Sequence, residues 1–211
     1  MGGILVLCTA NVCRSVYAAA LLNQALGSQL PVAGAGLNTE AGTLACSLVR
    51  ERADREGLEL PSRGSRVVRA SKLADSDLVL VMTAAQRVAV TKLLPEARAR
   101  TMTLIEASVI ATELARREVQ TDSLAEYVNS LNVMRSRVAM PSARVTHRCL
   151  SVVPTERRLK PATPITDGHA STAIRDHART LEKVAIHTGR IAEALATQAW
   201  ASAAAAEGNA S

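Results

Sequence analysis

The chain has 211 residues, of which 48% are hydrophobic and 1% aromatic, and its net charge at pH 7 is +6. This length fits one domain with a substantial, aliphatic core. No stretch approaches the ~18 uninterrupted apolar residues of a membrane helix, and the first residues lack the basic start and cleavage site of a secretory signal. We therefore expect a cytoplasmic protein with no membrane partner, whose four cysteines are thiols rather than disulfides.

The positive charge of the chain favours an anionic partner. The 25 Lys and Arg residues are scattered, however, and no aromatic residues alternate with them to stack on bases. We therefore expect no nucleic acid partner, and a phosphorylated substrate suits the same charge. The sequence leaves the oligomeric state unknown.

Short apolar runs alternate with helical patterns through the first half of the chain. The predicted strands are 3–7, 30–36, 77–82 and 101–105. The predicted helices between them are 16–26, 42–57 and 83–94. Continuous apolar runs are typical of strands buried on both faces, and alternation with helices indicates parallel βαβ units. We expect an α/β fold with a four-stranded parallel sheet and helices on both faces.

The second half of the chain departs from this alternation. Residues 106–163 are predicted to be an extra helical insertion before the last helix, with Ser123 and Glu126 spaced as a capping box. The Pro-rich, basic stretch 141–164 reads as a loop, and an apolar stripe from Ile174 to Leu195 predicts the last helix. We expect one domain over 1–198 and a flexible tail at 199–211.

The junction between the first strand and the first helix, "LVLCTANVCRS" at 5–15, carries Cys8 and Arg14 six positions apart. Such a loop lies at the carboxyl edge of a parallel sheet, where open α/β folds bind ligands. A helix N-terminus there favours anions, including the reactive thiolate of a cysteine. The guanidinium of Arg14 matches phosphate oxygens. The pattern predicts a phosphate-binding loop with its own nucleophile.

Each of these residues also has a simpler interpretation. Cys8 at a strand end is often a small buried apolar residue, and Arg14 at a helix start is often solvated. Cys8 and Cys13 as metal ligands are disfavoured, because no second cysteine pair or histidine cluster has the spacing of a zinc site. We expect no metal and no cofactor.

The loop "VLCTANVCRS" resembles the phosphate-binding loop of the low-molecular-weight protein tyrosine phosphatases. "VAGAG" at 32–36 is similar to the second strand of that family, and 62–98 is similar to the stretch that ends in its third strand and the next helix. "PITDGHAS" at 164–171 stands where the family carries an Asp-Pro loop. The resemblance covers about 1–105 and 164–198.

The resemblance implies a role for each matched residue. Cys8 would attack phosphorus and form a phosphocysteine, Arg14 would bind the equatorial oxygens, and Asp167 would act as general acid and then general base. Asn11 would hold the loop in a left-handed conformation, and Cys13 would trap an oxidised Cys8 as a disulfide. The residues implied to bind the substrate are Thr9, Ala10, Asn11, Val12, Cys13, Ser15 and His169.

The sequence departs from the family around the substrate pocket. Gly168 replaces the proline after the general acid, and His169 replaces the aromatic residue that follows it. Tyr17 and Tyr127 are the remaining candidates for an aromatic wall.

The predicted function is a cysteine-dependent phosphatase acting on phosphotyrosine proteins or small aryl phosphates. One alternative is a weak or inactive module that binds phosphate or phosphoproteins on the same scaffold. A further alternative is an arsenate reductase, which needs resolving cysteines, whereas Cys46 and Cys149 lie far apart in the sequence.

Overall fold

A central parallel sheet organises the protein. The computed structural model describes residues 2–138, 142–143, 160–161, 164–165, 167 and 174–200. The sheet consists of β1 (Ile4–Cys8), β2 (Val32–Gly36), β3 (Leu78–Val81) and β4 (Thr101–Thr103). All pairs are parallel, in the order β2-β1-β3-β4, which confirms the predicted fold class. β1 lies inside the sheet, so its carboxyl end opens between the ends of two neighbouring strands.

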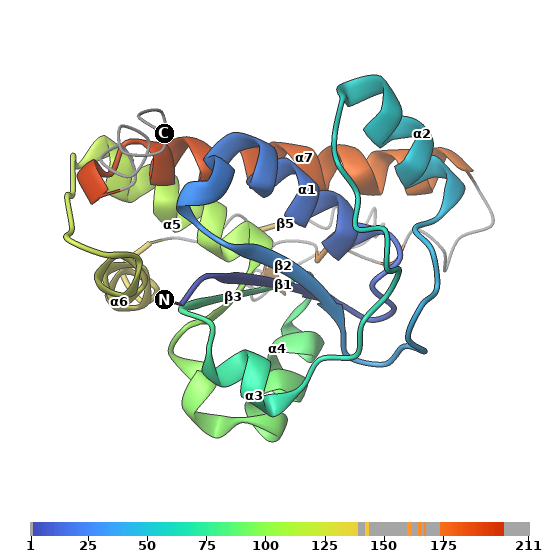
Figure 1. Ribbon diagram of the computed structural model, residues 1–211. Coiled ribbons are helices and arrows are strands. Elements are labelled where there is room, and N and C mark those ends of the chain that lie inside the picture. The colour runs from blue at the N-terminus through green and yellow to red at the C-terminus, as the bar shows by residue number, and fades with distance from the viewer. Residues whose placement is uncertain are drawn as a thin grey trace, which may run out of the picture.

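Helices cover both faces of the sheet (Figure 1). The helices are α1 (Arg14–Leu26), α2 (Ser47–Glu56), α3 (Ala70–Ala74), α4 (Ala84–Leu93), α5 (Leu104–Arg116), α6 (Leu124–Met134) and α7 (Ile174–Ala196). The short 3-10 helices are η1 (Gly27–Gln29) and η2 (Pro95–Arg98), and a two-residue antiparallel pair joins β5 (Ser142–Ala143) to β6 (Lys160–Pro161). α1, α5 and α7 lie on one face of the sheet, and α3 and α4 lie on the other. None of the helices in the described part of the chain has the length and apolar character needed to cross a membrane.

The strands divide their side chains between two cores. Ile4 and Val6 of β1 belong to the larger core with α1, α5, α6 and α7, while Leu5 and Leu7 belong to a smaller core with α3 and α4. All four side chains are at most 2% exposed. Each such burial stabilises the fold by roughly 1.5–3 kcal/mol. This two-sided burial explains the continuous apolar run, and it fixes the position of the residue that follows the run, Cys8.

The fourth strand is shorter than predicted. β4 ends at Thr103, and the next two residues of the expected strand already belong to α5. The hydroxyl of Thr103 accepts from the Glu106 amide at 3.2 Å, and the Glu106 carboxylate accepts from the Thr103 amide at 3.2 Å. This reciprocal capping box overrides the strand preference of the apolar pair at 104–105.

The second helix also begins later than predicted. α2 starts at Ser47, and Leu44, expected on its apolar face, is 59% exposed in the preceding segment. The amide of Cys46 donates to the Val12 carbonyl at 2.8 Å. That contact fixes the start of α2 on the loop that follows β1.

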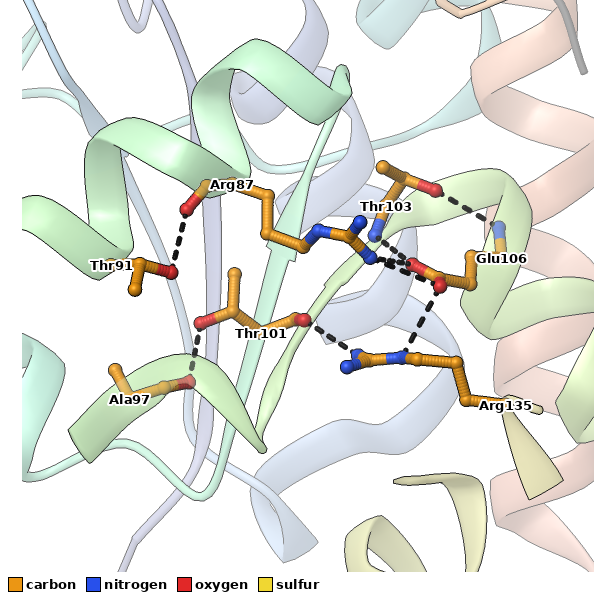
Figure 2. A network of polar contacts seen from close by, with 7 residues as sticks. All are labelled: Arg87, Thr91, Ala97, Thr101, Thr103, Glu106 and Arg135. Atoms are coloured by element: carbon orange, nitrogen blue, oxygen red, sulfur yellow. Dashed lines mark hydrogen bonds and ion pairs between the residues drawn. The ribbon is translucent and has the colours of Figure 1, made fainter. Parts of the chain in front are cut away.

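A polar network joins β4 to its neighbouring helices (Figure 2). Glu106 forms ion pairs with Arg87 of α4 at 3.0 Å and with Arg135, just after α6, at 3.2 Å. Arg135 also donates to the Thr101 carbonyl at 2.7 Å. Glu106 is only 12% exposed, so these partners satisfy a carboxylate that burial would otherwise destabilise. The network fastens the helices after β4 to the edge of the sheet.

The last helix has the predicted apolar stripe. Leu181, Val184, Ile191 and Leu195 of α7 are buried, whereas Ala178 is exposed. α7 packs against both α1 and α5. The capping interaction of α6 is also present, since the hydroxyl of its N-cap accepts from the Glu126 amide at 3.3 Å.

Several predicted features fall largely outside the described residues. They include most of the loop at 141–164 and the tail beyond 200. At the start of the expected tail, the Trp200 ring N–H donates to Thr121 Oγ1 at 3.1 Å. α5 spans residue 106, where the insertion was expected to begin.

Candidate active site

The thiol of Cys8 lies at the carboxyl end of β1 and is 2% exposed. The Asn11 amide donates to Cys8 Sγ at 3.2 Å, and the Ser15 hydroxyl lies 3.1 Å from the same sulfur. A thiolate accepts such hydrogen bonds more strongly than a neutral thiol does. The loop and the first turn of α1 therefore fix the position of this sulfur from two sides.

Asn11 shapes the loop. Its φ of 52° lies in the left-handed region, which asparagine tolerates better than most residues. The buried side-chain amide donates to Ser15 Oγ at 2.9 Å, and its oxygen accepts from the Arg66 amide at 3.0 Å. Asn11 thus joins the loop, α1 and the segment after β2. The sequence predicted this conformation but not the contact with Arg66.

The loop also lies against the end of β2. Gly36 pairs with Cys8, and a Cβ added at Gly36 would lie 2.8 Å from the Thr9 carbonyl oxygen. That separation is shorter than real Cβ contacts allow. A glycine is therefore required here for close approach rather than for an unusual φ.

Three side-chain or backbone donors from other elements hold the outer part of the loop. Gln86 Nε2 donates to Thr9 Oγ1 at 3.1 Å, and Thr39 Oγ1 donates to the Ala10 carbonyl at 2.7 Å. The Cys46 amide donates to the Val12 carbonyl at 2.8 Å. Gln86 falls inside the helix predicted at 83–94, and the sequence did not indicate its contact with Thr9. A glutamine at the third helical position can turn back toward the sheet edge.

The loop presents its own amides to a ligand. Within the described residues, the amides of Ala10, Val12 and Cys13 have no hydrogen-bond acceptor. The first amides of α1 have none inside the helix, as in every α-helix. Together with the positive end of the helix dipole, these N–H groups form a site suited to an oxyanion beside Cys8.

Arg14 is 3% exposed and brings a distant segment to the loop. Its Nη1 donates to the Ile165 carbonyl at 3.1 Å, and its Nη2 lies 2.7 Å from Asp167 Oδ2. Its Nε is buried without a hydrogen-bond partner in the described part of the chain. The Ile165 amide in turn donates to the Met82 carbonyl at 3.3 Å, just after β3. An oxyanion on the loop would supply the acceptor that Nε lacks.

The structure brings together the two ends of the predicted catalytic set. Asp167 is in direct contact with Arg14, and its side chain is 36% exposed, so the carboxylate lies at the boundary between the loop and solvent. His169 and Gly168 lie outside the described residues. The sequence linked Asp167 to the loop through a family resemblance alone, because composition does not distinguish it from the other aspartates.

Cys13 has neighbours that the sequence did not indicate. Its Sγ lies 2.8 Å from His177 Nε2, and Cys46 Sγ lies 3.8 Å from the same nitrogen. A hydrogen bond with Cys46 and burial of the thiol raise the pKa of Cys13. Cys8 and Cys13 are both free thiols. Cys46 is far from the other cysteines in the sequence, which argued against it as a resolving cysteine. In the structure it lies close to Cys13.

No tyrosine or tryptophan lines the loop. Tyr17 is 0% exposed, and its hydroxyl donates to Glu56 at 2.7 Å under the guanidinium of Arg52. Burial and the Glu56 hydrogen bond raise the pKa of this hydroxyl. Tyr127, on the buried face of α6, is 1% exposed, and Trp200 bonds to a residue before that helix. Neither tyrosine therefore serves as the aromatic wall considered from the sequence.

Comparison with known proteins decides the family. The sequence model of the low molecular weight phosphotyrosine protein phosphatases matches residues 3–137. The chain belongs to this family. Its members are hydrolases of phosphoric monoesters, and the position of Cys8 at the end of the first strand fits a cysteine-based phosphatase of this kind.

Curated relatives carry the same description. "Probable low molecular weight protein-tyrosine-phosphatase AmsI" of Erwinia amylovora is 33% identical over 102 residues, which are 48% of this chain and 70% of the relative. The low molecular weight protein-tyrosine-phosphatase Etp of Escherichia coli is 32% identical over 99 residues, 47% of this chain and 66% of the relative. For EpsP of Ralstonia nicotianae the matched share of the relative is 57%. The matched region thus spans 57–70% of the length of these phosphatases.

Solved structures support the fold. The YwlE arginine phosphatase from Geobacillus stearothermophilus matches with a TM-score of 0.59 and 20% identity, covering 93% of this chain and 94% of its own. A low molecular weight protein tyrosine phosphatase from T. tengcongensis matches with a TM-score of 0.58 and 18% identity, covering 92% and 99%. At this identity the likeness concerns the arrangement of the elements.

Proposed function

We propose that this phosphatase hydrolyses phosphate monoesters through a phosphocysteine on Cys8. The observation that carries the proposal is the buried Arg14 Nε without a partner, beside a loop in which the amides of Ala10, Val12 and Cys13 also lack acceptors in the described residues. These donors suit the equatorial oxygens of a phosphoryl group with phosphorus next to Cys8 Sγ. They would stabilise the charge that develops in the transition state.

The reaction has two steps. In the first, the Cys8 thiolate attacks phosphorus, the bond to the ester oxygen breaks, and Asp167 transfers its proton to the leaving oxygen. In the second, Asp167 takes a proton from water, the resulting hydroxide attacks phosphorus, and the thiolate leaves with release of inorganic phosphate. The Ser15 hydroxyl, 3.1 Å from the sulfur, stabilises the departing thiolate.

The contact between Asp167 and Arg14 has a place in this scheme. Without substrate, the carboxylate occupies one edge of the guanidinium. When phosphate oxygens take over that edge, the half-exposed carboxylate remains at the mouth of the loop, where a leaving group would lie.

The substrates proposed are phosphotyrosine proteins and small aryl phosphates, as the names of the relatives suggest. The burial of Tyr17 and Tyr127 favours a second candidate, a phosphate carried on a non-aromatic side chain. Phosphoarginine is the specific case to examine, given the activity named for one structural neighbour. It is a phosphoramidate, so a P–N bond would break in the first step and the leaving nitrogen would receive the proton.

Hydrolysis of p-nitrophenyl phosphate by the purified chain tests the proposal. Cys8→Ser should abolish turnover while inorganic phosphate still binds, because serine is a far weaker nucleophile than a thiolate in an otherwise intact loop. Cys149→Ser is the matched control and should retain activity. Equal turnover in wild type and Cys8→Ser would refute the assignment. Phosphate binding without turnover in the wild type would favour the binding module, and thiol-dependent reduction of arsenate would favour the reductase.

Phosphotyrosine and phosphoarginine peptides of matched sequence then separate the two substrate candidates. A kcat/KM at least ~10-fold higher for one class identifies the preferred side chain. The Cys8→Ser variant, prepared in the same way, serves as the blank. Any hydrolysis in its preparation measures the activity of contaminating phosphatases.

A further inference from the structure

Three metal-ligating side chains from distant parts of the sequence meet beside the phosphate-binding loop. They are Cys13, Cys46 and His177, whose Sγ, Sγ and Nε2 atoms all lie within 4.8 Å of one another. Among the described residues, no other group of histidine, cysteine or carboxylate ligands is brought together in this way. None of the three is the proposed nucleophile or the general acid.

The backbone holds these side chains in place. Cys13 is the N-cap of α1, Cys46 is the N-cap of α2, and His177 lies in the first turns of α7. The Cys46 amide donates to the carbonyl of residue 12, directly before Cys13. α7 packs against α1 along its length. The cluster therefore joins three helices at positions that packing already determines.

The distances suit a tetrahedral site. Zinc lies about 2.3 Å from cysteine sulfur and about 2.0–2.1 Å from histidine nitrogen, which puts neighbouring ligand atoms roughly 3.5–3.8 Å apart. A sulfur and a nitrogen on zinc lie near the lower end of that range, so the separation of 3.8 Å between Cys46 Sγ and His177 Nε2 is within about 0.3 Å of the required distance. The separation of 2.8 Å between Cys13 Sγ and His177 Nε2 must lengthen by somewhat less than about 1 Å. Rotation of the half-buried imidazole supplies a change of that size.

The chemistry of the donors selects the cation. Thiolate and imidazole prefer thiophilic ions such as Zn²⁺ over Mg²⁺ or Ca²⁺, which prefer oxygen. Two thiols this close cannot both ionise readily, and a divalent cation would neutralise both thiolates once their protons leave.

We propose that Cys13, Cys46 and His177 bind one Zn²⁺ ion, with the fourth tetrahedral position open to water or an external ligand. Binding releases the two thiol protons to solvent and involves no change in oxidation state. The three ligand side chains take no part in the proposed hydrolytic steps, and the presence of the metal site does not depend on whether Cys8 acts as a nucleophile. Its effect on the loop follows from Cys13, which Zn²⁺ would withdraw from any disulfide with Cys8.

Cobalt titration of the reduced, metal-free protein tests the site. Co²⁺ should bind at one ion per chain, with the thiolate charge-transfer and tetrahedral d–d absorption bands typical of sulfur coordination, and Zn²⁺ should displace it. Cys46→Ser and His177→Gln should each weaken binding by more than the roughly 10–100-fold that loss of an outer-shell partner produces. A signal that lacks sulfur charge transfer would overturn the proposal.

Matched variants locate the site. His187→Gln, on the same helix, and Cys149→Ser should leave Co²⁺ affinity within about threefold of wild type, a difference of under ~1 kcal/mol. Cys8→Ser should also keep binding, whereas loss of binding in Cys8→Ser with retention in Cys46→Ser would place the metal elsewhere and refute the proposal.

Alkylation of the wild-type protein gives a readout that is independent of variant folding. Zn²⁺ should protect Cys46, which is partly exposed whereas Cys13 is buried, from N-ethylmaleimide, as mapped by mass spectrometry. Unchanged labelling of Cys46 at saturating Zn²⁺ would contradict the site.

Discussion

At the scale of single residues, Arg14 needs a bound anion to complete its hydrogen bonds. A buried hydrogen-bond donor without a partner destabilises a fold by about 1–3 kcal/mol, and more when the donor is charged. Arg14 Nε is such a donor within the described residues, while the two Nη atoms are already engaged by Ile165 and Asp167. An oxyanion that accepts from Nε removes this penalty. Phosphate should therefore raise the thermal stability of the protein as well as occupy the loop.

The exposed carboxylate beside Arg14 gives a second prediction at this scale. Asp167→Asn should lower kcat by on the order of 100-fold or more for phenyl phosphate, whose leaving group needs a proton. For p-nitrophenyl phosphate the loss should be much smaller, because that phenolate leaves readily unprotonated. A kinetic series of substituted phenyl phosphates measures the difference.

The matched control for this series is Asp54→Asn, an exposed aspartate on α2. It should leave every rate close to wild type. If Asp167→Asn lowers kcat by the same factor for every leaving group, the carboxylate acts through Arg14 as a positioning group, and another acid protonates the leaving oxygen.

The sequence predicts some site residues far better than others. The loop from Cys8 to Ser15 is contiguous, so strand, thiol, arginine and helix start are visible together. Asp167 contacts Arg14 from a segment that is distant in the sequence, and a family resemblance was needed to select it. Cys46 and His177 approach Cys13 from separate helices, so no spacing along the chain reveals their cluster.

At the scale of elements, the capping box of α5 decides where β4 ends. Thr103→Ala removes the acceptor for the Glu106 amide and should lower the free energy of unfolding by about 1 kcal/mol. Thr103→Ser keeps the hydroxyl and should recover most of that loss. Urea denaturation at neutral pH measures all three proteins.

An exposed threonine inside the same helix serves as the control. Thr112→Ala should leave stability nearly unchanged, because alanine has the better helix propensity and the hydroxyl only bonds back to the Ser108 carbonyl. Equal losses for Thr103→Ala and Thr112→Ala would show that the box does not determine the start of α5.

Boundaries of elements were predicted less well than their existence. β1 and β3 were visible in the sequence because short aliphatic runs that are buried on both faces are typical of the inner strands of a parallel sheet. At β4 the pattern "TLIE" fits both a strand and a capped helix start, and the reciprocal hydrogen bonds of Thr103 and Glu106 favour the helix. At α2 the apolar Leu44 suggested an earlier start, but Cys46 is fixed to the loop by a tertiary contact.

At the scale of the whole molecule, the packing of α7 against α5 makes stability depend on pH. His187 is half-buried between these helices, with its Nδ1 2.6 Å from Ser108 Oγ. Burial lowers the pKa of His187 below its ordinary 6.5, and the neighbouring Arg190 and Lys183 lower it further. Well above pH 6.5 the imidazole is neutral in both the folded and the unfolded chain, so this residue adds no pH dependence there.

Below that pH the two states differ. The unfolded chain takes up a proton that the folded chain resists, so the free energy of unfolding falls as the pH is lowered. This loss cannot exceed about 1.4 kcal/mol per pH unit for one residue. His187→Gln should therefore lose less stability than wild type between pH 7.5 and 5.5 in urea denaturation. Parallel losses in both proteins would exclude His187 as the source.

The packing of α7 on α1 also sets the order in which the site is completed during biosynthesis. A ribosome delivers Cys8 and Arg14 early, yet the acceptors at Ile165 and Asp167 and the helix that covers α1 are among the last described segments to emerge. Until then the nascent chain carries a thiol loop with an open apolar flank, which is a surface that chaperones bind and that aggregates readily. Because these segments supply the partners of Arg14 and α1, activity should appear only after α7 has emerged from the ribosome, and not when the sheet first folds.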